Sequence, residues 1–222
     1  MESYAKLSGA VYQCRIGEDA QVGSNAYLTV ATAVRSVGAE RFSQWRYHKV
    51  LARIRNEDDL RLYRELESRM NQNRENFEQD GYKPHLYGAV ITGTFSKIGD
   101  RLTYIDADRV EIAKSDSHNV RFQNYAKVKG EVVQVKSFGG FAVISLKIGK
   151  ESIFPVTVYR EDKECWDRFK RKMPNEGETI MVEGVVVPKI YSNGHKNIDM
   201  TGIEVKKYEL VKKLSPTPSK SI

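Results

Sequence analysis

The chain has 222 residues, of which 29% are charged, with a formal net charge of +7 and a mean hydropathy of −0.54. No apolar run approaches the ~20 residues that cross a bilayer, which argues against a membrane partner or a helical membrane protein. The opening Met1-Glu2-Ser3-Tyr4 lacks the basic and then apolar pattern of a secretory signal, so we expect the mature chain to start here and to stay in the cytoplasm.

The positive charge is unevenly distributed along the chain. Residues 1–118 carry 17 basic and 17 acidic side chains, whereas residues 119–222 carry 19 basic and 12 acidic ones. A surplus of cations favours a polyanionic partner, because contact with phosphates releases condensed counterions. On charge alone, a soluble basic domain that has no polyanionic partner explains the surplus equally well.

Two cysteines, Cys14 and Cys165, lie among apolar neighbours. A disulfide between them is possible in principle, but we favour two buried small hydrophobic side chains. Neither has a second Cys or a His at zinc-ligand spacing, and we expect no metal and no cofactor.

The sequence contains an internal repeat. The stretch from Tyr4 to Cys14 returns from Tyr125 to Val135, with Tyr-Ala-Lys, Gly, Val and Gln at the same offsets. We therefore expect two related domains, residues 1–113 and 125–210, joined by a polar connector at 114–124. Each is large enough to bury a core.

In the first repeat, alternating apolar and polar residues predict three strands, Tyr4–Ile16, Ala26–Arg35 and Trp45–Ile54. Asn56-Glu57-Asp58-Asp59 then has the side-chain oxygens and negative charge of a helix N-terminus. The predicted core positions of this helix are Leu62, Tyr63, Leu66 and Met70. A polar insertion at 71–84, expected to be mobile, precedes a hairpin of two further strands, Leu86–Phe95 and Leu102–Ile112.

The second repeat shows the same order with shorter loops. Its predicted strands are Tyr125–Ser137, Phe141–Ile148, Ser152–Tyr159, Thr179–Ile190 and Asn197–Leu210. A helix over Lys163–Lys172 follows the third strand, and its predicted core positions are Cys165, Trp166, Phe169 and Met173. Residues 211–222 are rich in Pro, Ser and Lys, which predicts a disordered basic tail.

Three strands, one helix and two strands is the element order of an OB-fold, a small five-stranded barrel. An all-β chain with one helix per repeat also fits a sandwich, but the repeated helix position favours the barrel. The predicted fold class is therefore all-β with one helix per repeat, arranged as two tandem OB-fold barrels.

The second repeat resembles the bacterial-type single-stranded DNA-binding proteins (SSB). The resemblance rests on motifs in sequence order, namely Val128-Lys129-Gly130, the strand Phe154–Tyr159, the stretch Glu176–Gly184, and Tyr191 seven residues after Gly184. It covers nearly all of 125–210 and is weaker over the first repeat. It implies a protein that coats single-stranded DNA during replication, recombination or repair, in the cytoplasm of a bacterium or a phage-infected host.

The resemblance also implies where bases would stack. Tyr159 takes the place of the family's aromatic at the end of the third strand, and Tyr191 that of its hairpin aromatic. In the first repeat, Phe95 lies seven residues after Gly88 and would match Tyr191, while Tyr47 is similar to the family's aromatic in the third strand. The first repeat has no clear counterpart of Tyr159, and the family's acidic C-terminal tip is missing because the tail here is basic.

The residues themselves lead to a similar site, because a groove for a single strand needs cations for the phosphates and flat rings for the bases. The candidates in the first repeat are Tyr27, Arg35, Trp45, Tyr47, Lys49 and Arg53, which are expected to face outward, and Phe95 through its match to Tyr191. The candidates in the second repeat are Lys136, Phe141, Lys147, Tyr159, Arg160, Lys189, Tyr191 and Lys196. For each aromatic the alternative is packing in the core or between the domains, and Phe138 could wedge its loop against the other barrel.

Catalysis is not expected. The sequence has no phosphate loop and no GxSxG or HExxH motif. Asp100, Asp106 and Asp108 could form a magnesium site, but we prefer to see them as solvated acids of a hairpin.

The sequence therefore predicts a non-enzymatic protein that binds single-stranded DNA with little sequence preference, mainly through its second repeat. A homodimer is expected by analogy with the tandem arrangement of some bacterial SSBs. The alternatives are an OB-fold adaptor of a replication or conjugation complex and an RNA-binding OB protein. A nuclease is a more distant alternative.

Overall fold

The computed structural model describes residues 3–19, 23–35, 45–54, 60–80, 86–98, 102–115, 122–148, 152–192 and 197–211. Its elements in chain order are β1 (Tyr4–Asp19), β2 (Gly23–Arg35), β3 (Trp45–Ile54), α1 (Leu60–Asp80), β4 (Leu86–Ile98), β5 (Leu102–Ser115), β6 (Gln123–Ser137), β7 (Phe141–Ile148), β8 (Ser152–Tyr159), α2 (Lys163–Arg171), β9 (Thr179–Ser192) and β10 (Asn197–Leu210). Neither helix, as far as it is described, is long and apolar enough to span a bilayer.

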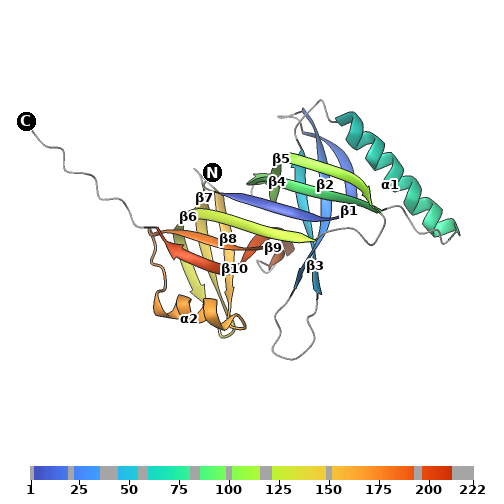
Figure 1. Ribbon diagram of the computed structural model, residues 1–222. Helices are drawn as coiled ribbons and strands as arrows, with labels where there is room; N and C mark the ends of the chain where they lie inside the picture. The colour runs from blue at the N-terminus through green and yellow to red at the C-terminus, as the bar shows by residue number, and fades with distance from the viewer. Residues whose placement is uncertain are drawn as a thin grey trace, which may run out of the picture.

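The ten strands close into two five-stranded barrels (Figure 1). Barrel 1 runs β1-β2-β3-β5-β4 and returns to β1, and barrel 2 runs β6-β7-β8-β10-β9 and returns to β6. Within the barrels, the β3–β5 and β8–β10 pairings are parallel and the other pairings of the described strands are antiparallel. This is the strand order of the OB-fold, which confirms the predicted tandem pair.

The internal repeat is visible in the irregularities of the strands as well as in their order. In both barrels the first strand has a β-bulge at the same place, between Val11 and Gln13 in β1 and between Val132 and Gln134 in β6. A β-bulge is a local feature that a sequence must encode specifically. The two first strands are therefore equivalent residue by residue.

An antiparallel pairing of β1 with β6 joins the barrels into one continuous sheet. Ala5 lies opposite Ala126, with Tyr4 opposite Lys127 on one side and Lys6 opposite Tyr125 on the other. Because Tyr4 and Lys6 are the repeat counterparts of Tyr125 and Lys127, the pairing is symmetric about the Ala5–Ala126 pair. The two barrels are thus related by an approximate two-fold axis at this point.

Two glycines correct one predicted correspondence between the repeats. Gly93 lies opposite Ala5, and Gly184 lies opposite the equivalent Ala126. A Cβ on either glycine would lie 2.0 Å from a backbone oxygen of β5 or β10, so neither position can hold a side chain. The counterpart of Gly184 is therefore Gly93 and not Gly88, and the predicted match of Phe95 to Tyr191 is wrong.

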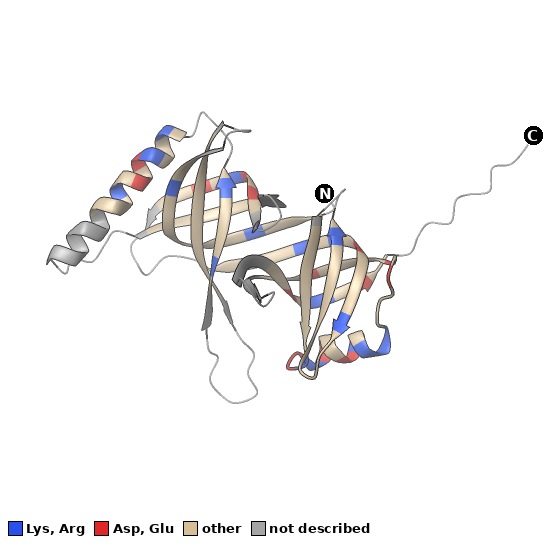
Figure 2. Ribbon diagram, turned by 180° about the vertical axis from the view of Figure 1, so that it is seen from behind, with Lys and Arg blue, Asp and Glu red and all other residues tan. Residues whose placement is uncertain are grey.

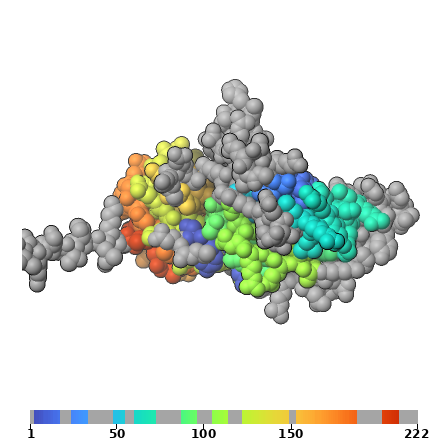
Figure 3. Space-filling view, turned by 90° about the horizontal axis from the view of Figure 1, so that it is seen from above, coloured from blue at the N-terminus to red at the C-terminus, as the bar shows by residue number. Residues whose placement is uncertain are grey.

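Helix α1 packs on barrel 1 on the side away from barrel 2 (Figures 1 and 3). Leu60, Tyr63 and Leu66 are buried, but Leu62 is 53% exposed and does not belong to the core as predicted. Two residues along a helix correspond to a turn of about 200°, which places Leu62 opposite Leu60. The helix continues to Asp80, so this part of the predicted mobile insertion is helical, in keeping with its lack of Gly and Pro.

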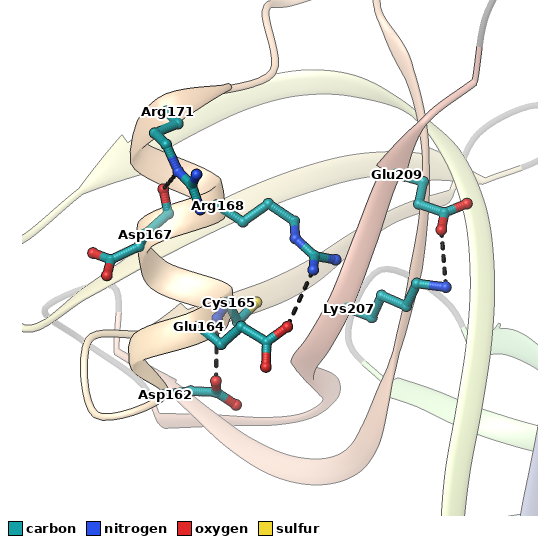
Figure 4. Close-up of polar contacts among 8 residues, drawn as sticks. All are labelled: Asp162, Glu164, Cys165, Asp167, Arg168, Arg171, Lys207 and Glu209. Carbon is teal, nitrogen blue, oxygen red and sulfur yellow. Dashed lines mark hydrogen bonds and ion pairs between the residues drawn. The ribbon is translucent and has the colours of Figure 1, made fainter.

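Helix α2 packs on barrel 2 through the buried Cys165, Trp166 and Phe169, whereas the predicted core residue Met173 is 47% exposed. The carboxylate of Asp162 caps the helix by accepting from the Cys165 backbone N–H at 3.2 Å (Figure 4). At the other end, the Tyr208 hydroxyl of β10 donates to the Lys172 carbonyl at 2.6 Å.

Both cysteines are free and buried, Cys14 in β1 and Cys165 in α2, which confirms the preferred interpretation of these residues. Burial raises the pKa of the Cys14 thiol to about 12 and that of Cys165 to about 11. The cause is the cost of placing a thiolate in an apolar interior.

Candidate nucleic-acid interface

Three aromatic rings meet on the outer surface of barrel 2, and we call them the aromatic cluster: Phe138, Phe141 and Tyr159. The ring centroids of Phe138 and Phe141 are 4.7 Å apart and the rings are stacked, and those of Phe141 and Tyr159 are 6.1 Å apart and tilted. Phe138 is 48% exposed and Phe141 is 37% exposed. Tyr159 is half-buried. Exposed rings offer flat faces on which bases can stack.

The strand pattern of β7 and β8 produces this arrangement. Ala142 and Val158 point inward and are buried, so the neighbouring Phe141 and Tyr159, which lie opposite each other in register, point outward. Two hydrogen bonds fix the turn, because the N–H of Phe138 donates to the Phe141 carbonyl at 2.7 Å and that of Arg160 to the Gly140 carbonyl at 2.9 Å. The cluster is therefore held by backbone structure and not by a loose loop.

Two predicted cations, Lys136 and Arg160, are exposed and border the cluster in sequence and in register. A third, Lys147, is exposed at the far end of β7, about 20 Å from Phe141 at ~3.4 Å per residue. Basic and acidic residues are interleaved along the strands of both barrels and along both helices in the described part of the chain (Figure 2). Rings with nearby cations, and not a single block of positive charge, characterise this face.

Two of the three positions of the cluster have described counterparts in barrel 1, and neither holds an aromatic ring. Arg15 lies opposite Tyr27 in β1 and β2, as its repeat counterpart Lys136 lies opposite Val143. Two residues further along the same pair of strands, Gly17 lies opposite Asn25. The positions in barrel 2 that correspond to Gly17 and Asn25 are Phe138 and Phe141. Glycine and asparagine in barrel 1 therefore occupy the places of two rings in barrel 2.

Arg53 points away from the interior of barrel 1, opposite Tyr27, but it is not the exposed cation that was predicted. It is 4% exposed, and its guanidinium donates to both carboxylate oxygens of Asp106, at 2.8 and 3.0 Å. The two residues are neighbours across the parallel β3–β5 pairing. A buried bidentate pair is neutral overall, so Arg53 is not available to a phosphate. Asp106 is one of the three acids considered for magnesium, and here it binds Arg53 instead. Among the described residues, no three His, Cys, Asp or Glu side chains are grouped so that they could hold a metal ion.

Phe95 lies between the barrels. It is partly buried, and its ring centroid is 4.7 Å from that of Phe154 in β8. The alternative of packing between the domains therefore describes this ring better than an open base-stacking position.

Tyr27 and Lys49 are the other first-repeat candidates whose side chains are described. Tyr27 is half-buried, with its ring against Gly17. Lys49 is exposed, and its Nζ lies 3.5 Å from the ring centroid of Tyr12, which is itself 57% exposed. Sequence reasoning did not include Tyr12 or Phe138 among the candidates. Tyr12 directly follows the inward-facing Val11, so strand alternation alone could have placed its ring on the outer face.

The remaining candidates fall outside what the structure describes. Arg35, Trp45, Tyr47, Lys189 and Tyr191 lie in strands whose backbone is described but whose side chains are not. Lys196 lies outside the described residues altogether. Their roles stay predictions.

These features define the class of protein as a tandem OB-fold chain with an exposed aromatic platform on its second barrel. No protein-family model matches the sequence, and no curated protein matches it either. Among solved structures, the fold is similar to the wild-type single-stranded DNA binding protein from Thermus aquaticus, with a TM-score of 0.61 and 14% sequence identity over 97% of this chain and 95% of that one. A deletion mutant of the same protein gives a TM-score of 0.62 at 14% identity, over 99% and 98% of the two chains. At this identity the likeness concerns the fold, and it extends over both barrels.

Proposed function

We propose that this protein binds single-stranded DNA and coats exposed strands, without strong sequence preference, during replication, recombination or repair. The observation that carries the proposal is the aromatic cluster, with three neighbouring rings at the surface of an OB-fold barrel and Lys136 and Arg160 beside them. The fold likeness to a protein whose name states that it binds single-stranded DNA adds support.

The mechanism follows from the chemistry of the face. Cations capture the strand by displacing condensed counterions from its phosphates. Bases then stack on the rings, each contributing about 1–3 kcal/mol with little dependence on base identity. Neither step requires a cofactor or a covalent reaction.

We further propose that the two barrels divide the work, with barrel 2 providing the stacking face and barrel 1 assisting or mediating assembly. The described part of barrel 1 supports this division. Arg53 is neutralised by Asp106, Phe95 packs against barrel 2, and Gly17 and Asn25 stand where barrel 2 has rings.

A titration of the full chain with dT oligomers of increasing length, at several salt concentrations, tests the proposal. We expect binding that weakens steeply with salt. The double variant Phe141→Ala, Tyr159→Ala is expected to lose roughly a hundredfold in affinity, because two stacking surfaces are removed. Leu62→Ala, which removes an exposed apolar side chain from α1, is the matched control and should bind as the wild type does.

Each alternative has its own outcome in the same experiment. Binding that is weak and insensitive to salt would favour a protein-interaction adaptor. Tighter binding of matched rU than of dU oligomers would make RNA the preferred partner. The mass of the free protein, measured alongside, tests the expected homodimer.

A further inference from the structure

A second feature of the outer face of barrel 2 lies at the other end of β7 and β8 from the aromatic cluster. It is a hollow of about 590 Å³, which we call the Val133 hollow, lined by Glu131, Val132, Val133, Lys147, Ile153, Glu176 and Gly177. Its volume is within the usual range of ligand pockets. Val133 is 37% exposed and Ile153 is 46% exposed, so the hollow presents aliphatic side chains to solvent.

Backbone structure fixes the floor of the hollow. Val133 lies at the β-bulge between Val132 and Gln134 and faces outward, because its neighbour Val132 faces the core. The turn before β9 is fastened to this bulge, because the N–H of Val132 donates to the Glu178 carbonyl and the N–H of Gly177 to the Val132 carbonyl, both at 2.8 Å. Gly177 has a φ of 80°, a conformation that glycine adopts without strain. The shape is therefore preformed.

Barrel 1 shows what fits at this place. The counterpart of Val133 in the repeat is Tyr12, on the equivalent bulge of β1. Lys49 of β3 lies opposite Ala31 of β2, as Ile153 of β8 lies opposite Lys147 of β7. Barrel 1 thus fills the position with its own aromatic ring under a lysine ammonium, at 3.5 Å from the centroid. Barrel 2 has a lysine here as well, on β7 instead of β3, but aliphatic residues in place of the ring.

The rim of the hollow differs from that of the aromatic cluster in its charge. Glu131 and Glu176 are exposed carboxylates and both line the hollow. A carboxylate only accepts hydrogen bonds, so it attracts N–H donors and repels carbonyl oxygens and phosphates. Among the bases, cytosine and adenine carry an exocyclic amino group on the edge where uracil and thymine carry a carbonyl.

We propose that the Val133 hollow accepts one unstacked base of the bound strand and prefers a base with an exocyclic amino group. The base ring lies against Val133 and Ile153 with the Lys147 ammonium beside it, and its amino group donates to Glu131 or Glu176. The phosphates stay outside, away from the carboxylates. The inference rests on the proposed function, and it adds a modest base preference to a face that otherwise stacks bases without regard to sequence.

A single strand can reach both places. Phe141 and Lys147 lie on the same outer face of β7, about 20 Å apart. Their partners across the strand pair are Tyr159 and Ile153. The aromatic cluster and the Val133 hollow are thus two ends of one track along β7 and β8.

The test compares dC and dU oligomers of equal length, which differ in the amino or carbonyl group of the base. The measured quantity is the ratio of the dU to the dC dissociation constant, so that general differences in stacking cancel between variants. We expect this ratio to be about fivefold higher for the wild type than for Glu131→Gln, Glu176→Gln, because an amide can pair with either base. Glu164→Gln, which changes an exposed acid of α2 in the same way, should leave the ratio unchanged.

A second variant fills the hollow without changing its charge. Val133→Tyr gives barrel 2 the residue of barrel 1 at an exposed position, and we expect it to lower the ratio to the value of the double glutamine variant. Ratios that are equal in the wild type and in both variants overturn the inference while leaving the proposed function intact if dT still binds. Absence of dT binding overturns both.

Discussion

The two barrels share their strand order, their bulges and their obligatory glycines, yet their outer faces differ in kind. At matched positions, Arg53 and Asp106 of barrel 1 form a buried ion pair, whereas barrel 2 has Thr157 and Glu204. The inward-facing residues must fill a closed barrel, so they stay apolar in both repeats. The outward-facing residues carry no such constraint. A duplicated fold can therefore keep one scaffold and place different chemistry on each copy.

The largest expected difference between matched variants of the two barrels comes from disrupting the ion pair in barrel 1. Arg53→Ala removes the guanidinium that binds both carboxylate oxygens of Asp106 and is expected to lower the free energy of unfolding by about 3 kcal/mol. Thr157→Ala at the matched position of barrel 2 should cost about 1 kcal/mol or less. Urea denaturation of both variants measures the difference.

The double replacement Arg53→Met, Asp106→Leu is the control for this prediction. It removes both charges of the pair together and should stay near wild-type stability, because apolar side chains of similar size replace the ion pair. If Arg53→Ala proves as mild as Thr157→Ala, the pair does not act as a buried one.

The rings provide the next largest effect. The double variant Tyr159→Ala, Tyr191→Ala in barrel 2 is expected to weaken oligo-dT binding about a hundredfold, since two stacked bases lose their partners. Trp45→Ala, Tyr47→Ala in barrel 1 should weaken it about threefold. Phe95 is not replaced in the barrel 1 variant, because its ring packs against Phe154 and its removal would loosen the contact between the barrels. Equal losses in a fluorescence titration would contradict the division of labour.

The buried cysteines of the two repeats, unlike the outer faces of the barrels, should affect stability in the same way as the pH rises. Burial raises the pKa of Cys14 to about 12 and that of Cys165 to about 11, from an ordinary value of 9.0. Above pH 9.0 the unfolded chain therefore releases thiol protons that the folded chain retains, and stability falls as the pH rises. At pH 10 each thiol should cost about 1.4 kcal/mol relative to pH 7.

Urea denaturation of Cys14→Ala and Cys165→Ala at pH 7 and pH 10 checks this prediction. Each variant should lose the same amount of the alkaline sensitivity of the wild type. A pH dependence that neither substitution changes would show that other groups cause it.

The smallest expected effect concerns matched basic residues of the two barrels and the salt dependence of DNA binding. Lys136 of barrel 2 and Arg15 of barrel 1 are repeat counterparts, and both are exposed. Lys136→Ala should reduce the slope of log affinity for dT against log salt by about 1, as expected for one lost phosphate contact. Arg15→Ala should leave the slope unchanged. If Arg15→Ala reduced the slope as much as Lys136→Ala, the DNA-binding face would include barrel 1.

Much of the fold could be predicted from the sequence, because strand alternation and the repeated opening motif are local signals. The strand order, the helix position and the outward direction of Phe141 and Tyr159 follow from them. The position of Arg53 could not be found in this way, since it depends on the parallel contact with β5, more than fifty residues along the chain. The same holds for Phe95, whose partner Phe154 belongs to the other repeat.

Some misassignments came from the register of the pattern. Gly88 was matched to Gly184 by its distance from an aromatic, but the pairing with the first strand identifies Gly93. Tyr12 could have been placed outward by its alternation with Val11, whereas the β-bulge at this point changes the direction of the residues that follow, such as the buried Cys14.

The pairing of β1 with β6 has a consequence for any attempt to separate the repeats. A fragment that begins near Gln123 would keep all five strands of barrel 2 but would expose the free edge of β6 from Gln123 to Lys127. Exposed strand edges recruit other strands. Because Ala126 already sits on the approximate symmetry axis, a second copy of the fragment could bind along this edge with Ala126 opposite Ala126. Cutting the chain in two would then yield a symmetric pair of identical barrels in place of a monomer.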